Sequence, residues 1–103
     1  MATRESIEMD FRQAMAQADK IDGIADCLSQ TSNDRFGGAL QNMAAGWKGE
    51  NASAYLGKGA RLKNRMDTSA SDLHNSAAAI RRAAHRIYEA EMAALDIANN
   101  RSY

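Results

Sequence analysis

The residues best suited to chemistry in this chain lie near its C-terminal end. His85, Glu89, Met92 and Asp96 follow one another at steps of four, three and four residues. In an α-helix with 3.6 residues per turn, these steps place the four side chains on one face. An ordinary helix-surface pair of His85 and Glu89 would contribute only about 0.2–0.5 kcal/mol. The alternative to an ordinary surface pair is that these four side chains form an exposed face that another protein recognises. The rest of the chain has to support this interpretation.

Catalysis and metal binding are not indicated. The two histidines, His74 and His85, are eleven residues apart, and the single cysteine, Cys27, is near neither of them. That spacing is far from the arrangement of zinc ligands. No phosphate-binding loop and no nucleophile with an adjacent base can be identified. We therefore expect no enzyme, no metal site and no cofactor, and a function that depends on being recognised.

The charge pattern argues against a nucleic-acid binder and for pairing between the two halves. The formal net charge of the 103 residues is zero, whereas a nucleic-acid-binding domain is usually basic. Residues 1–46 carry four basic and seven acidic side chains, a net charge of −3; residues 47–103 carry nine and six, a net charge of +3. Opposite charges favour antiparallel pairing of two helices, although each exposed ion pair contributes only about 0–1 kcal/mol.

Composition is typical of long helices. Hydrophobic residues make up 45% of the chain and aromatic residues 6%, and proline is absent. Alanine-rich sequences without proline favour uninterrupted helices that pack closely. A single cysteine rules out an internal disulfide. The N-terminal stretch contains neither a signal-peptide pattern nor a membrane span, so we expect a protein that stays in the cytoplasm or leaves it without a cleaved signal.

The strongest turn signal in the chain is Gly46-Trp47-Lys48-Gly49. Glycine adopts the positive φ angles that end a helix and reverse the chain. The following helix can be capped by Asn51 or by Gly49 itself. Trp47, the only tryptophan, is expected to seal the end of the hairpin, while part of its indole can remain presented for recognition.

The first helix is expected at about residues 5–44, capped by Thr3 or Ser6. Its apolar positions alternate at steps of four and three residues: Ile7, Phe11, Ala14, Ala18, Ile21, Ala25 and Leu28. The steps from Leu28 through Ser32 to Phe36 are both of four residues, a stutter that unwinds a coiled coil locally without ending the helix. The alternative is a loop at residues 29–34 and a three-helix bundle.

The second helix is expected at about residues 51–98, after a turn at about 45–50 and before a short C-terminal tail. It carries an unbroken apolar stripe, here named the first stripe: Tyr55, Gly59, Leu62, Met66, Ser69, Leu73, Ser76, Ile80, Ala83, Ile87, Ala90, Ala94 and Ile97. A second stripe runs beside it: Leu56, Ala60, Ala70, His74, Ala77, Ala84, Tyr88 and Leu95. We assign the first stripe to the contact within the chain. The second is then available for another subunit, so a four-helix bundle is the simplest way to bury both.

The turn, the two helices and the chain length together resemble the WXG family, the small substrates of type VII secretion systems that include the early secreted antigenic target proteins. The resemblance covers nearly the whole chain as architecture, and its sequence motif is the central Trp47-Lys48-Gly49. It implies a protein exported to the extracellular space without a cleaved signal peptide. It also implies recognition by the type VII secretion ATPase or machinery, and a role as substrate and carrier or partner for a larger effector.

The same resemblance assigns a secretion signal to the C-terminal face. His85, Glu89 and Met92 match a form of the family's export signal, in which the position of Asp96 would hold a second histidine. The other form, a tyrosine followed four residues later by an acid, fails because Met92 follows Tyr88. In the family the turn tryptophan of one subunit lies close to the C-terminal signal of the other.

The sequence thus predicts an all-α, antiparallel helix-turn-helix hairpin that forms a homodimer, with a heterodimer with a similar small helical protein as the open alternative. Two other functions stay open: a cytoplasmic adaptor that pairs with the helical N-terminal domain of a larger toxin, and a purely structural coiled coil. The residues expected in the hairpin core are Ile7, Phe11, Ile21, Leu28, Leu62, Met66, Leu73, Ile80 and Ile87.

Overall fold

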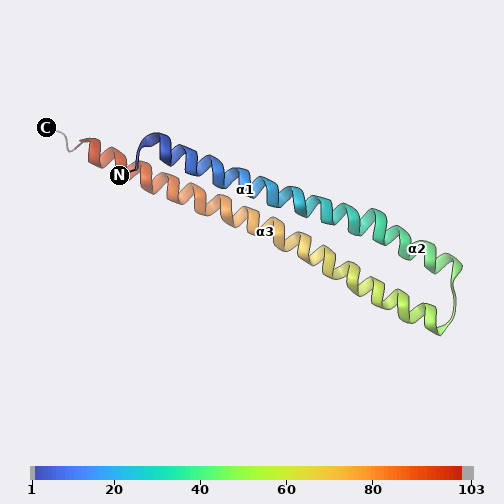
Figure 1. The fold of residues 1–103 in the computed structure, drawn as a ribbon. Coiled ribbons are helices and arrows are strands. Elements are labelled where there is room, and N and C mark those ends of the chain that lie inside the picture. The colour runs from blue at the N-terminus through green and yellow to red at the C-terminus, as the bar shows by residue number, and fades with distance from the viewer. Residues whose placement is uncertain (1, 101–103) are drawn as a thin grey trace. The chain divides into compact units, whose positions relative to one another are not determined.

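The computed structural model describes residues 2–100, and all of its regular structure is helical. The elements in order are α1 (Arg4–Gln30), the π-helical segment η1 (Thr31–Phe36), α2 (Gly37–Gly46) and α3 (Glu50–Asn100) (Figure 1). No strand occurs in this range. The predicted all-α class is confirmed.

The chain divides into two compact units, each built from two helical segments that run side by side in opposite directions (Figure 1). Among the described residues, the first unit combines 2–21, which include the start of α1, with 75–100 of α3. The second unit is residues 22–74 and contains the rest of α1, η1, α2, the turn and the beginning of α3. Because the chain reverses between α2 and α3, this second unit is a helical hairpin.

Thr3 and Ser6 together cap the beginning of α1. The Ser6 N–H donates to Thr3 Oγ1 at 3.1 Å, and the Thr3 N–H donates to Ser6 Oγ at 3.0 Å. This reciprocal pair satisfies backbone donors that have no partner within the helix, in the manner of a capping box. Glu5 adds a negative charge to the first turn, where the helix dipole favours it.

The stutter after Leu28 coincides with η1. The residues at its two ends, Gln30 (φ −63°, ψ −44°) and Gly37 (φ −61°, ψ −42°), are helical, so no loop separates α1 from α2. A π-helical turn contains more residues than an α-helical turn, which agrees with the local unwinding expected at a stutter. The alternative of a loop at residues 29–34 and a three-helix bundle is therefore wrong. Gly37 fits the close packing here, because a Cβ at this position would lie 3.3 Å from both Lys63 Cε and Ser32 O.

The turn occupies residues 47–49, between the end of α2 at Gly46 and the start of α3 at Glu50. Trp47 is extended (φ −125°, ψ 123°), and its N–H donates to Met43 O at 2.8 Å to close α2. Gly49 has a φ of 114° and is the only described residue with a positive φ. Its carbonyl accepts a hydrogen bond from Ser53 N at 3.0 Å, so Gly49 is the residue at the N-cap of α3, immediately before Glu50. The helices extend one or two residues beyond each of their expected bounds.

The buried seam consists of small side chains. Ile7 is the only large apolar residue among the buried described ones, and the largest fully buried side chain is that of Ser32. Two runs of three buried residues have a spacing of seven, which keeps one edge of each helix facing its neighbour: Ala18, Ala25 and Ser32, and Ala70, Ala77 and Ala84. The buried residues are Ile7, Ala18, Ala25, Ser32, Ala52, Ala70, Ala77 and Ala84.

The first apolar stripe of α3 does not take the place expected for it in the contact within the chain. Leu62 and Ile87, assigned to the core, are 49% and 57% exposed, and no member of the first stripe is buried. Alanines of the second stripe are buried instead, because their small side chains let two helices approach closely. Of the other residues assigned to the core, Ile7 is buried, and the rest are partly exposed: Phe11, Ile21, Leu28, Met66, Leu73 and Ile80.

Candidate interaction surfaces

The turn presents an aromatic pair. The rings of Trp47 and Tyr55 lie with their centroids 5.5 Å apart and their planes tilted by 33°. Trp47 is 39% exposed and Tyr55 is 60% exposed. Lys58 Nζ lies 5.9 Å from the centroid of the Tyr55 ring, at the outer limit of a cation–π contact. The indole is thus partly packed against Tyr55 and partly exposed.

A shallow apolar groove lies between α2 and α3 in the same unit. At its base the two helices approach closely, because a Cβ added at Gly59 would overlap Leu40 Cδ2. Tyr55 joins the groove to the aromatic pair, and Lys58 gives it a positive edge. Its lining residues are Phe36, Ala39, Leu40, Met43, Tyr55, Lys58, Gly59 and Leu62.

In the first unit, the residues of the candidate secretion signal lie on α3. His85, Glu89 and Asp96 are exposed, and Met92 is half-buried. The His85 ring packs edge-on against Phe11 of α1, with ring centroids 4.9 Å apart and planes at 67°. The spacing of the four residues along one helix is as expected, but the sequence did not indicate that His85 rests on α1.

Phe11 also organises an apolar groove between α1 and α3 in this unit. Its ring lies 4.9 Å from the ring of Tyr88, centroid to centroid. The carboxylates of Asp10 and Glu91 border the groove and give it a negative edge. The lining residues are Ile7, Asp10, Phe11, Ala14, Ala84, Ile87, Tyr88 and Glu91. Phe11 and Tyr88 both stood in apolar stripes of the sequence, but only the register of the two helices shows that they meet.

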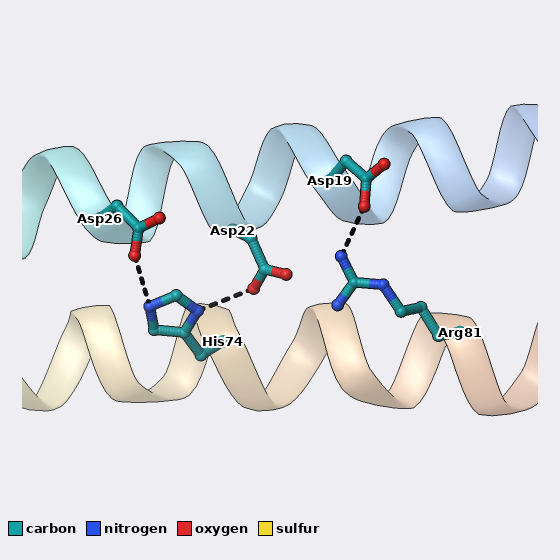
Figure 2. A network of polar contacts seen from close by, with 5 residues as sticks. All are labelled: Asp19, Asp22, Asp26, His74 and Arg81. Atoms are coloured by element: carbon teal, nitrogen blue, oxygen red, sulfur yellow. Dashed lines mark hydrogen bonds and ion pairs between the residues drawn. The ribbon is translucent and has the colours of Figure 1, made fainter.

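His74 links α3 to α1 within the second unit (Figure 2). Its Nδ1 lies 2.7 Å from Asp22 Oδ1, and its Nε2 lies 3.1 Å from Asp26 Oδ1. The hydrogen bond with Asp22, and then the negative charge of both carboxylates, raises the pKa of His74 above its ordinary value. His74 belongs to the second stripe, and helical spacing could not identify its partners because they are about fifty residues away along the chain.

A second polar cluster joins η1 to α3. The Ser32 hydroxyl donates to Asp67 Oδ1 at 2.6 Å, and Lys63 Nζ donates to Asp67 Oδ2 and to Asn33 Oδ1, each at 3.0 Å. The hydrogen bond from Ser32, followed by that from Lys63, lowers the pKa of Asp67. The buried hydroxyl of Ser32 is therefore satisfied across the helix pair, which explains how a polar residue fits into the seam.

The charge difference between the two halves of the sequence agrees with two of the contacts between α1 and α3. In the first unit, Arg81 of α3 donates to Asp19 Oδ1 of α1 at 2.7 Å (Figure 2). His74 meets acidic residues of α1 in the second unit. Both contacts match an acidic first helix that pairs with a more basic second one.

The described residues offer no arrangement of three His, Cys, Asp or Glu side chains that could hold a metal ion. Cys27 is free and exposed on α1. None of the helices, over the range that the structure describes, is long and apolar enough to cross a membrane.

Comparison of the chain with known protein families, with curated proteins and with solved structures gives no match.

Proposed function

We propose that this protein is a helical-hairpin interaction module that pairs with a second hairpin, in the first instance another copy of itself, to form a four-helix bundle. The observation that carries the proposal is the distribution of large apolar side chains. In the described part of the chain only Ile7 of these is buried, whereas Tyr55, Leu62, Ile87 and Ile97 are 60%, 49%, 57% and 59% exposed. A seam of alanines buries little apolar surface, so a partner is needed to cover the larger side chains.

The exported role that we propose for the module is that of a type VII secretion substrate, which also acts as carrier or partner for a larger effector. Trp47, partly exposed in the turn that also contains Gly49 with its positive φ, would form one recognition element. His85 and Glu89, exposed on α3, and the half-buried Met92 would form the other. The secretion ATPase would recognise these two elements, and the protein would reach the extracellular space without a cleaved signal peptide.

The test of pairing is the native mass of the purified protein, measured by light scattering over a dilution series. We expect twice the monomer mass. The variant Leu62→Asp should shift the protein to monomer, because it places a charge on the exposed face. The control is Asp72→Ala, at an exposed position of the same helix. A monomer at every concentration would contradict self-pairing and favour the adaptor for a helical domain of a larger toxin.

The test of export compares Glu89→Ala with the control Asp72→Ala in a host that carries a type VII system. We expect the amount of protein in the medium to fall only for Glu89→Ala, with helicity and native mass unchanged for both. Equal export of the two variants would contradict the signal assignment. The pairing proposal would be unaffected by that result, because the measurement of native mass tests it separately.

A further inference from the structure

The contacts of His74 have an unusual geometry for a histidine on a helix surface. Both ring nitrogens face carboxylate oxygens, Nδ1 that of Asp22 at 2.7 Å and Nε2 that of Asp26 at 3.1 Å (Figure 2). The two aspartates are one helical turn apart on α1, and the imidazole reaches between them from α3. All three residues belong to the second unit.

This geometry specifies a protonation state. An ionised carboxylate only accepts hydrogen bonds, and a neutral imidazole carries only one N–H. Two carboxylates can be satisfied together only by the imidazolium, in which both ring nitrogens donate. In the neutral form, a nitrogen lone pair would face one of the two carboxylates at hydrogen-bonding distance, which is repulsive.

No charged residue lies one helical turn before or after His74 on its own helix, α3. Its neighbours one turn before and after on α3 are Ala70, Ser71, Ala77 and Ala78. The groups that face it from α1 are the two acidic ones, Asp22 and Asp26. Like charges one turn apart on a helix repel each other, and a cation between them relieves that repulsion.

We propose that His74, Asp22 and Asp26 form a pH-dependent clasp, which fastens α1 to α3 in the second unit when His74 is protonated and loses one of its two links when His74 is neutral. The side chains of His74 and Asp26 are 43% and 68% exposed. Protons can therefore reach the ring from solvent without unfolding of the hairpin.

The direction of the pH dependence follows from the contacts. Both carboxylates favour the charged ring, so the pKa of His74 is higher in the folded protein than in the unfolded chain. The stabilisation is complete below the ordinary histidine pKa of about 6.5 and is lost as the pH rises through the raised pKa. The clasp is thus closed in mildly acidic solution and loosens toward alkaline pH.

The experiment measures the midpoint of thermal unfolding from about pH 5.5 to about pH 8.5, a range that spans the histidine titration. Wild type is compared with His74→Gln, and His85→Gln serves as the matched control at the other histidine. One protein concentration is used throughout, so that any self-association contributes equally. We expect the wild-type midpoint to fall as the pH rises, His85→Gln to keep this fall, and His74→Gln to lose most of it.

Two further measurements keep the test decisive if His74→Gln folds poorly. An NMR titration of the His74 ring protons in wild type should give a midpoint above about pH 6.5, and Asp26→Asn should move that midpoint downward. A His74 midpoint at or below about 6.5, or the same pH dependence in wild type and His74→Gln, would overturn the clasp. None of these results depends on export or on the identity of a partner.

Discussion

Replacing Gly49 with alanine should destabilise the hairpin by about 1–3 kcal/mol. The φ of Gly49 is 114°, a conformation that residues with a Cβ rarely adopt. No atom lies within 4 Å of the position that an added Cβ would take, so the cost does not come from a collision. The cost comes from backbone strain. Either the alanine is held at this φ, or the connection between α2 and α3 is distorted so that the alanine can adopt another φ.

Gly23 provides the matched control. It lies inside α1, and an added Cβ would also meet nothing within 4 Å. Because alanine is favoured over glycine in a helix interior, Gly23→Ala should stabilise the protein by about 0.8–1.0 kcal/mol. The same chemical change should therefore have opposite signs at the two positions, with a difference of about 2–4 kcal/mol.

The assay is urea unfolding followed by far-ultraviolet circular dichroism, at one protein concentration for all variants because association adds to the apparent stability. A Gly49→Ala variant as stable as wild type, or stabilised as much as Gly23→Ala, would refute the assignment of a glycine-specific backbone at this turn. Gly46 offers an internal comparison, because it ends α2, has no positive φ and leaves open space around an added Cβ. Gly46→Ala should be tolerated.

Three further predictions concern the packing between the helices. Gly59→Ala should be less stable than Gly23→Ala by about 1–3 kcal/mol in the same urea assay, because the added Cβ displaces the Leu40 side chain and this cost offsets the gain in helix propensity. Equal stabilisation of the two variants would contradict the close approach of α2 and α3 at Gly59. Ser32→Ala should lower the free energy of unfolding by about 1–2 kcal/mol, because it removes the hydrogen bond from the buried Ser32 hydroxyl to the Asp67 carboxylate. An unchanged free energy of unfolding would show that this hydrogen bond does not stabilise the fold. The lowered pKa of Asp67 stabilises the folded protein above the ordinary pKa of about 3.8, and this stabilisation is lost as the pH falls through the lowered pKa. Ser32→Ala should therefore lose less stability than wild type in an acid titration. The same acid dependence in both proteins would contradict the role of Ser32 in lowering this pKa.

The number of helices and the place of the turn could be read from the sequence because local signals determine them. Gly49 is needed for one backbone angle, and the absence of proline leaves nothing to interrupt α3. The stutter between Leu28 and Phe36 was also informative, since its two steps of four residues coincide with η1. These features depend on residues close together in the chain.

The face of α3 that meets α1 could not be read in the same way. Hydrophobic periodicity gives weight to large side chains, so it selected the stripe with Leu62 and Ile87 for the core. The structure selects Ala70, Ala77 and Ala84, whose advantage is the close approach of two backbones and not their own hydrophobicity. That advantage exists only when the facing helix also presents small side chains, which a single helical pattern does not reveal.

The candidate sites show the same division. The turn residues and the face with His85 and Glu89 follow from spacing within one helix or one turn. The contacts of His74 with Asp22, and of Phe11 with His85, join residues from distant parts of the sequence. Such contacts depend on the register of α1 against α3, and a shift by one helical turn would replace every partner. The opposite charges of the two halves predicted that such pairs exist, but not which residues form them.

The alanine seam and the exposed stripe are two consequences of one arrangement. A helix with two apolar stripes can turn only one of them toward its neighbour in the hairpin, and here the smaller residues take that place. Complete burial of a side chain such as Leu62 or Ile87 contributes about 1.5–3 kcal/mol, so the half that remains exposed on each is worth about 1 kcal/mol on association. Several such side chains on each of two copies would contribute more than the alanines of the seam can. The stability of this protein should therefore depend strongly on its concentration, which a hairpin with its large residues inside would not show.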